Sequence, residues 1–487
     1  MSHRRPPRLG PFLAALTTVT VLGSGWAVEL PSLFTDGAVL QRDRPVPIWG
    51  TARPGEAVTV SFAGQTLRTT ADAKGDWSVL LAPMPASPVG RSLTVNEVER
   101  RDLLVGEVWV CCGQSNMEMP VGNGYRPKVY PGMEGFAAAV AAADLPSVRL
   151  FRPDHQTARR PLRDLPPTRW ERCTPATVGR FSAVGFCFAR DLHRALGVPV
   201  GVIAVAKSST TVAAWSPTPA GAAAPPPETA TEADDPATPP KVSFAEPGAL
   251  YNGMVAPLMP FAVRGIAYYQ GESDAKDPDR YRSRFPALIT AWRSAWGQQD
   301  LPFLFVQLAN FGGRSPNPGD GGGWARQREA QAAALALPRT GMVVTIDIGH
   351  GTLIHPPNKA EVGRRLSVVA RAVAYGEPLP ARGPVFAGMD LEGHRVRVRF
   401  TCTDGGLKSR SDSGDHPAGF AIAGKDGLFH PAEALIEGDT VVVQAAAVPD
   451  PRHLRYAFAG NPQATLVNGA GLPAEPFRTD GPARAGP

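Results

Sequence analysis

Strand-like and helical segments alternate along the middle of the chain, and this alternation constrains the fold more than any other feature. Apolar, β-branched runs of strand length are separated by stretches with helical spacing. We predict strands at 105–110, 200–206, 263–269, 303–308 and 342–348, and helices at 181–196, 279–296 and 358–374. Parallel neighbours need a crossover connection, usually an α-helix. The alternation therefore predicts an α/β region at 105–378, with a mostly parallel sheet and helices on both faces.

Two of the predicted helices carry terminal signals as well as periodicity. The helix at 181–196 is followed by Gly197, which accepts the left-handed conformation common after a helix. The helix at 358–374 begins with Asn358 at the N-cap and Glu361 three residues later, as in a capping box. These signals place both helix ends.

The regions on either side read as β structure without helices. A chain of 487 residues is too long for one core, so several domains are expected. Short β-rich runs with turn signals predict an N-terminal β-sandwich-like domain at 28–104. The strictly alternating run at 396–400 belongs to a C-terminal β domain at 379–487. The segment 218–245, rich in Ala, Pro, Glu, Asp and Thr, is predicted to be a flexible insertion.

Residues 1–27 have the features of a cleaved signal peptide rather than of a frayed or anchored N-terminus. Three arginines precede the apolar run 11–23, and 25–27 is a small-x-small cleavage site. The mature protein is therefore expected to be secreted or periplasmic. No later segment approaches the ~20 apolar residues of a membrane span. Half of the formal net charge of +6 lies in this segment, so no nucleic-acid partner is expected, and nothing specifies an oligomeric state.

The five cysteines show neither a CxxC motif nor the spacing of zinc ligands, and no metal site is predicted. Cys173 and Cys187 have two interpretations. In an oxidising compartment they form a disulfide, and otherwise they are buried free thiols.

Polar residues follow each predicted strand of the α/β region. Sites in open parallel sheets form beyond the carboxyl ends of the strands. The residues at these ends are Gly113 to Met117, Ser208 to Thr211, Gln270 to Asp274, Gln307, Asn310, Asp347 and His355.

A serine nucleophile needs a base and donors for the oxyanion. Ser115 is the candidate nucleophile and His355 the candidate base. Gln270 or the backbone N–H groups near Ser209 are the candidate donors to the oxyanion. Taken singly, the serine also reads as a turn residue and the histidine as a residue at the surface or the edge of the core.

Three longer blocks carry a family resemblance. Residues 106–117 (GEVWVCCGQSNM), 268–275 (YYQGESDA) and 354–359 (IHPPNK) resemble the sialate O-acetylesterase family, within the SGNH hydrolases. Shorter matches extend the resemblance over nearly all of the mature chain except the 218–245 insertion. It implies an SGNH-type parallel sheet flanked by an N-terminal and a C-terminal β domain.

The resemblance also implies an activity and its residues. The protein would be a carboxylic ester hydrolase that removes O-acetyl groups from carbohydrate through an acetyl-enzyme. Ser115 would be the nucleophile and His355 the base. The oxyanion hole would comprise the Ser115 N–H, the Ser209 N–H and the Gln270 side chain. No cofactor would be required. The substrate would be acetylated sialic acid or an acetylated polysaccharide such as xylan.

The sequence departs from the family pattern where the triad acid is expected. Many relatives carry an Asp two or three residues before the histidine, where this chain has Leu353 and Thr352. Loss of the triad acid costs roughly 10⁴ in rate in trypsin-like enzymes. The substitute acids are Asp347 and Glu272. We favour Asp347, whose alternative role is to cap a strand end.

A second departure lies at Ser208-Ser209, where the family often has Gly-Gly. A serine N–H still donates to an oxyanion, but serine is strained if the backbone needs a positive φ. Asn116 and Glu272 are expected to support the site.

The two departures and the two β domains also suit a protein of another class. That alternative is a catalytically weak or inactive glycan-binding protein on the same fold.

Overall fold

The computed structural model describes residues 1, 28–217, 242–410, 412 and 414–481. The predicted signal peptide, apart from its first residue, lies outside the described residues. So does most of the predicted insertion at 218–245.

A mostly parallel sheet forms the centre of the molecule, as the sequence predicts. Its strand order is β13-β12-β11-β7-β10-β8-β9. All neighbours from β13 to β8 pair in parallel, and β9 is antiparallel to β8. In that order, the strands span Thr340–Val343, Phe303–Val306, Gly265–Tyr269, Val98–Gly113, Val200–Ala206, Leu145–Phe151 and Glu171–Cys173. The five predicted strands correspond to β7, β10, β11, β12 and β13; β8 and β9 were not predicted.

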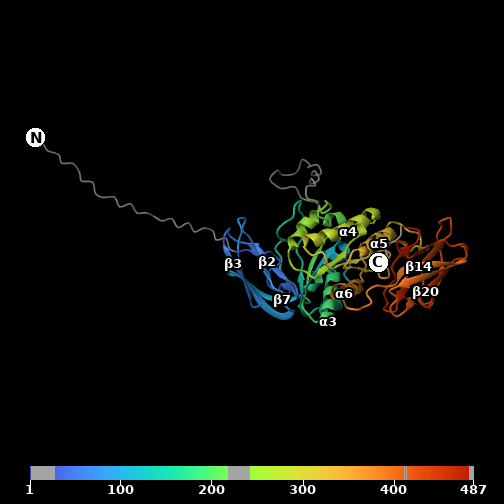
Figure 1. The fold of residues 1–487 in the computed structure, drawn as a ribbon, viewed down its shortest axis with the longest axis horizontal. Coiled ribbons are helices and arrows are strands. Elements are labelled where there is room, and N and C mark those ends of the chain that lie inside the picture. The colour runs from blue at the N-terminus through green and yellow to red at the C-terminus, as the bar shows by residue number, and fades with distance from the viewer. Residues whose placement is uncertain (2–27, 218–241, 411, 413, 482–487) are drawn as a thin grey trace.

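Helices cover both faces of this sheet (Figure 1). The longer helices are α3 (Ala183–Leu196), α4 (Pro278–Ala295), α5 (Gly323–Ala332) and α6 (Lys359–Tyr375). Along β7, Trp109 and Cys111 pack in one core with α3 and α6, while Val110 and Cys112 pack in the other core with α4. This alternation follows from the two-residue period of a strand. The predicted termini are confirmed, since Gly197 is left-handed and the Asn358 side chain accepts from the N–H of Glu361 at 3.3 Å.

The remaining helices are short. They are α1 (Ser115–Glu118), α2 (Phe136–Ala141) and the single-turn segments Val178–Arg180, Val212–Trp215, Tyr251–Val255, Ala256–Leu258, Glu272–Asp274 and Ala333–Ala336.

The N-terminal region consists of short strands. These strands are β1 (Val39–Gln41), β2 (Val46–Thr51), β3 (Ala57–Phe62), β4 (Gln65–Thr70), β5 (Asp76–Leu81) and β6 (Ser87–Val95). Of these, β1, β3, β4 and β6 join the central sheet through β7, while β2 and β5 form a separate two-stranded sheet. The first half of β7 pairs with β6, and its second half pairs with β10 and β11. The boundary predicted after residue 104 lies inside this continuous strand.

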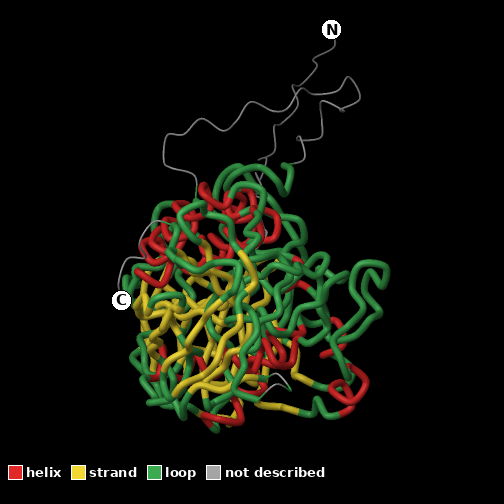
Figure 2. Tube along the Cα trace, turned by 90° about the vertical axis from the view of Figure 1, so that its right-hand side faces the viewer, coloured by secondary structure: helices red, strands yellow, loops and turns green. Residues whose placement is uncertain are grey.

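The C-terminal region is also built from strands, and Figure 1 shows it at the opposite end of the molecule from the N-terminal strands. One of its two four-stranded sheets has the order β14 (Val385–Glu392), β15 (Arg395–Thr401), β20 (Thr440–Gln444) and β19 (Glu433–Glu437). The alternating run predicted at 396–400 forms β15, with Val396, Val398 and Phe400 buried. The other has the order β18 (His430–Pro431), β17 (Phe420–Ala423), β21 (His453–Tyr456) and β23 (Phe477–Arg478), and β16 (Leu407–Ser409) pairs with β22 (Leu466–Asn468). In the view turned by 90°, the strands gather in the body of the molecule with helices around them (Figure 2).

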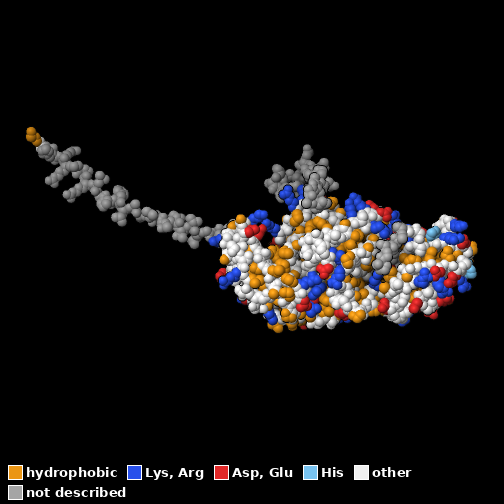
Figure 3. Space-filling model, in the orientation of Figure 1, with side chains coloured by type: hydrophobic (Ala, Val, Ile, Leu, Met, Phe, Trp, Pro, Cys, Tyr) orange, Lys and Arg blue, Asp and Glu red, His pale blue; other side chains and the backbone are white. Residues whose placement is uncertain are grey.

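Acidic and basic side chains are interspersed over the face of the molecule drawn in Figure 3. No helix within the described ranges is long and apolar enough to cross a bilayer.

All five cysteines are free, so Cys173 and Cys187 form no disulfide. Burial raises the pKa of both thiols to about 12, so both stay protonated.

Candidate active site

The candidate nucleophile lies directly beyond the carboxyl end of β7. Gly113 has a φ of +136°, and a Cβ there would lie 2.1 Å from the carbonyl oxygen of Tyr269. Only glycine allows β7 and β11 to end this close together. The N–H of Gln114 then donates to the same carbonyl at 2.9 Å, and Ser115 opens α1 with 6% of its surface exposed. As the first helical residue, Ser115 has an N–H without an intrahelical acceptor.

The candidate base, His355, lies in the loop that leads into α6. Its Nδ1 hydrogen-bonds the carbonyl oxygen of Val129 at 3.0 Å, and its ring lies 5.2 Å from the ring of Tyr130. A carbonyl only accepts, so Nδ1 carries the proton and Nε2 keeps its lone pair. Burial lowers the pKa of His355 below its ordinary 6.5, while the bond to Val129 acts in the opposite direction. The imidazole is therefore held in the form that a general base needs.

A buried amide joins the serine block to the histidine block. The Nδ2 of Asn116 donates to the carbonyl of Ile354 at 3.0 Å and to the Oε1 of Glu272 at 2.5 Å. Its Oδ1 accepts from the Nζ of Lys359. The residue after the candidate nucleophile thus contacts the residue before the candidate base. The three sequence blocks meet at this side chain. The predicted supporting residues, Asn116 and Glu272, are hydrogen-bonded to each other there.

The two charged members of this network, the fully buried Lys359 and the half-buried Glu272, perturb each other. Burial lowers the pKa of Lys359 to about 7, opposed by the charge of Glu272. Burial raises the pKa of Glu272, opposed by Asn116 and Lys359. Lys359 also lies 5.3 Å from the ring centroid of Tyr269. Glu272, one of the two substitute acids, contacts Asn116 and not the candidate base.

The turn after β10 carries the Ser208-Ser209 pair. Ser209 has a φ of +60°, so this position does require the left-handed backbone that favours glycine. Ser208 donates its N–H to the Oε2 of Glu118 at 2.7 Å. Its hydroxyl also contacts Glu118 and the hydroxyl of Tyr130. The turn is therefore fixed by a carboxylate from α1.

Gln270 directly follows β11, as predicted, but its side-chain N–H groups have other acceptors than an oxyanion. Its side chain is fully buried, and its Nε2 donates to the Oε1 of Gln114 at 3.1 Å, the carbonyl of Thr210 at 3.0 Å and the Oδ2 of Asp274 at 2.5 Å. An amide nitrogen has only two hydrogens. Both are used by these acceptors, so the structure does not offer them to an oxyanion at Ser115. Gln270 instead orients the side chain before the serine.

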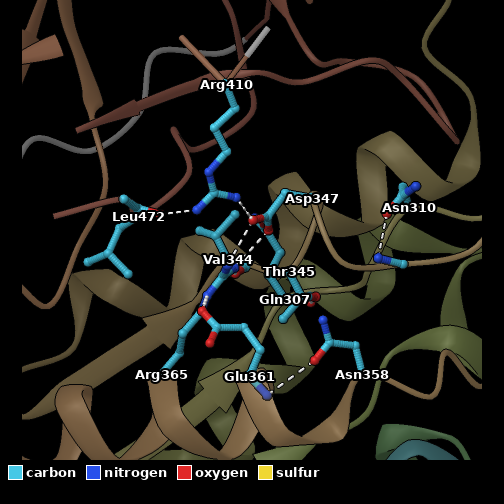
Figure 4. Close-up of polar contacts among 12 residues, drawn as sticks. Gln307, Asn310, Val344, Thr345, Asp347, Asn358, Glu361, Arg365, Arg410 and Leu472 are labelled. Atoms are coloured by element: carbon cyan, nitrogen blue, oxygen red, sulfur yellow. Dashed lines mark hydrogen bonds and ion pairs between the residues drawn. The ribbon is translucent and has the colours of Figure 1, made fainter. Parts of the chain in front are cut away.

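Asp347, the favoured substitute acid, is held by two arginines, Arg365 and Arg410 (Figure 4). Its two oxygens accept from the Nη1 and Nη2 of Arg365 at 2.7 Å each, and Oδ2 also contacts Arg410. Burial alone raises the pKa of this carboxyl, but the two arginines outweigh burial and hold it below its ordinary 3.8. The Nδ1 of His355 is taken by Val129. The structure thus corrects the expected pairing of Asp347 with His355, because two cations hold this carboxylate elsewhere.

Sequence reasoning missed four groups of the site. Val129 acts through its backbone oxygen, which no residue type signals. Tyr130 and Glu118 act through contacts with the turn after β10, and their spacing in the sequence gives no hint of this. Lys359 lies in the quoted histidine block, so its position, though not its role, was visible. Within the described ranges no group of three or more His, Cys, Asp or Glu side chains is placed to hold a metal ion.

Comparison with known proteins places these residues in a family. Residues 105–370 match the family model described as carbohydrate esterase, sialic acid-specific acetylesterase. The human sialate O-acetylesterase is 31% identical over 419 residues, which cover 78% of this chain and 77% of the human protein. The rat enzyme of the same name is 30% identical over 463 residues, 81% of this chain and 83% of its own. A crystal structure of a carbohydrate acetylesterase from Xanthomonas citri is 39% identical, with a TM-score of 0.83 over 93% of this chain and 100% of that one.

Proposed function

Because the chain belongs to the carbohydrate esterase family of sialic acid-specific acetylesterases, and hydrolyses O-acetyl groups on carbohydrates, we propose that Ser115 and His355 carry this reaction. The enzyme is a carboxylic ester hydrolase. One observation supports the assignment most: Asn116, next to the serine, is bonded to the backbone next to the histidine. We further propose that the fold is of the SGNH type, with β domains at 28–104 and 379–487 flanking the esterase domain at 105–378.

In the proposed mechanism, the Nε2 of His355 takes the proton of Ser115 as Oγ attacks the acetyl carbonyl. The tetrahedral intermediate collapses, and the protonated imidazole gives its proton to the departing sugar alcohol. A water molecule then attacks the acetyl-enzyme with the same histidine as base; the bond between Oγ and the acetyl carbon breaks, acetate leaves and the imidazolium returns the proton to Ser115. The two steps in which His355 acts as a base need the tautomer that the Val129 carbonyl holds.

The backbone N–H groups of Ser115 and Ser209 are the proposed oxyanion donors. Each donor of this kind stabilises the transition state by about 3 kcal/mol in the serine proteases. Ser209 presents its N–H from a left-handed turn that Glu118 holds. Gln270 has no part in the hole in this proposal, because its N–H groups are already paired.

A main-chain carbonyl replaces the triad acid in this arrangement. It fixes the tautomer and orientation of His355 as a carboxylate does, but it brings a dipole rather than a full charge. The imidazolium formed during reaction is therefore stabilised less, which agrees with a lowered pKa of His355 in the resting enzyme. We propose a Ser–His pair completed by Val129, with neither Asp347 nor Glu272 as a triad member.

The substrate and the location follow as further proposals. The curated relatives are named for sialate, and the Xanthomonas citri protein is named for carbohydrate in general. We propose an acetylated carbohydrate, either sialic acid or a polysaccharide such as xylan. The signal-peptide pattern at 1–27 supports a secreted or periplasmic enzyme.

The test is acetate release from p-nitrophenyl acetate, an acetylated sialoside and acetylated xylan. The wild type should release acetate, and Ser115→Ala and His355→Ala should lose nearly all activity. Ser92→Ala, which removes an exposed hydroxyl on β6, is the matched control and should behave as wild type. Activity that survives Ser115→Ala would refute the assignment. Tight glycan binding by an inert wild type would instead favour the glycan-binding alternative.

A further inference from the structure

The hydroxyl of Ser208 gives this protein a contact that glycine at the same position would lack. This hydroxyl is buried, and it hydrogen-bonds the hydroxyl of Tyr130 and the carboxylate of Glu118. Tyr130 also donates to the Oε2 of Glu118 at 2.9 Å. The three side chains, here called the 118–130–208 cluster, come from three separate parts of the chain. Their two hydroxyl hydrogens serve the three contacts, so at any moment at least one hydroxyl donates to the Glu118 carboxylate and the other donates to the carboxylate or to its neighbour. Burial raises the pKa of Tyr130, so its hydroxyl remains a donor.

The cluster is next to the group that orients the candidate base. Tyr130 directly follows Val129, whose carbonyl accepts from the Nδ1 of His355 at 3.0 Å. The ring of Tyr130 also packs against the imidazole at 5.2 Å between centroids. A displacement of Tyr130 would therefore move both the carbonyl and the ring wall of His355.

The loop before Tyr130 has few other contacts to hold it. Residues 123–129 are exposed, apart from the half-buried Tyr125, whereas Tyr130 is fully buried. The N–H groups of Val129 and Tyr130 both bond to the carbonyl of Arg126 within the same loop, at 2.8 and 3.0 Å. These local bonds shape the loop without tying it to the sheet. The 118–130–208 cluster makes the tie at this point of the loop.

The same carboxylate also holds the turn proposed for the oxyanion hole. Glu118 accepts the backbone N–H of Ser208 at 2.7 Å, one residue before the N–H proposed as a donor. Glu118 itself lies in α1, three residues after the candidate nucleophile. One side chain therefore links the nucleophile helix, the oxyanion turn and the loop that orients the base.

We propose that Ser208, Tyr130 and Glu118 are positioning residues that hold the Val129 carbonyl against His355 in place of a triad acid. The inference rests on the proposed function of Ser115 and His355. The inference links the two departures from the family pattern. The chain lacks an acid before His355, and Ser208 helps to hold the carbonyl that takes the place of that acid.

The experiment compares Ser208→Ala, Tyr130→Phe and the double variant with wild type. Tyr125→Phe is the matched control, since it removes a hydroxyl from the same loop, one without a hydrogen bond to the residues that the structure describes, and keeps the ring that stacks on Tyr130. Measurements are kcat and KM for acetate release, the pH profile of kcat, and the Tm. The two single variants should each lower kcat about tenfold, the effect of one weakened orienting hydrogen bond, with KM and Tm little changed. The double variant should be no slower than the slower single one, because both remove the same support.

The pH profile separates positioning from general structural damage. His355 faces the Val129 carbonyl and the charges of Lys359, Glu118 and Arg126. The Val129 bond raises the pKa of the imidazole, so its loss should move the acid limb of kcat to lower pH. An NMR titration of His355 reports the same shift without turnover. Tyr125→Phe should leave both readouts at their wild-type values.

The outcomes keep the two proposals apart. An inactive wild type, or an active Ser115→Ala, overturns the proposed function, and the His355 titration then decides the positioning inference alone. If the wild type is active through Ser115, unchanged kcat and unchanged His355 titration in Ser208→Ala and Tyr130→Phe overturn the inference. Multiplicative losses in the double variant also overturn it, because they show independent roles.

Discussion

The Asp347→Asn substitution separates a structural carboxylate from a catalytic one. The Asp347 side chain is 5% exposed and receives two 2.7 Å hydrogen bonds from Arg365, whose own side chain is 3% exposed. It also pairs with Arg410 in the C-terminal region. Asparagine keeps the shape but loses the charge and one acceptor oxygen. The variant therefore leaves a buried guanidinium without its principal partner.

The structure sets the expected size of the effect. Removing one partner of a buried ion pair destabilises a protein by about 3–5 kcal/mol. Arg365 keeps two other contacts, with Glu361 and the carbonyl of Val344, both at 2.7 Å, so the cost should fall near about 3 kcal/mol. A triad acid would behave differently: its loss costs roughly 10⁴ in kcat, about 5 kcal/mol of barrier. The two roles predict opposite patterns of stability and rate.

The assay measures urea unfolding and the kcat of acetate release on the same preparations. We expect Asp347→Asn to lose stability while the folded enzyme keeps a kcat within about threefold of wild type. Asp450→Asn is the control, because its exposed pair with Arg452 should contribute at most about 1 kcal/mol. The folded pKa of Asp347 is lowered, so its contribution is complete above the unfolded value of 3.8 and is lost as pH falls through the folded value. A kcat loss of thousands-fold with unchanged stability would refute this reasoning and restore Asp347 as the triad acid.

Three further predictions concern the site. Because burial lowers the pKa of His355, the acid limb of kcat/KM should have its midpoint below 6.5; a midpoint above 6.5 would contradict the environment described for this base. Ser209→Gly should stabilise the protein by up to about 1 kcal/mol in thermal unfolding and keep wild-type kcat, since the backbone N–H remains while a positive-φ serine is replaced; a large loss of kcat would show that the Ser209 side chain takes part. Lys359→Met should lower kcat by releasing Asn116 and should raise the acid-limb pKa of kcat/KM, because the lysine charge lowers the pKa of His355; an unmoved limb would place the lysine charge too far away to matter.

The strands of the central sheet could be predicted where they are uniformly apolar. They could not be predicted where a buried charge depends on a partner from a distant part of the chain. The strands β10, β11, β12 and β13 are buried along nearly their whole length, so local composition signals them. The strand β8 carries Arg149, which is nearly fully buried because Asp102 pairs with it at 2.7 Å. A charged residue in a short run argues against a buried strand unless its partner is known. That partner lies 47 positions earlier in the chain, beyond the reach of a local pattern.

The candidate site divides along a similar line, between roles that side chains identify and roles that the backbone performs. Ser115 and His355, the proposed nucleophile and base, could be named from the sequence because these two roles need particular residue types. The proposed orienting group of the base, the Val129 carbonyl, could not be named, since every residue of the chain offers a carbonyl and Val129 differs only in where its loop is held. A search restricted to carboxylates therefore arrives at Asp347, which does follow a strand end but is taken by arginines 18 and 63 positions later in the chain. Where a backbone carbonyl is proposed to replace an acid, the residues to look for in the sequence are the ones that hold its loop in place. In this chain those residues are Ser208, Tyr130 and Glu118.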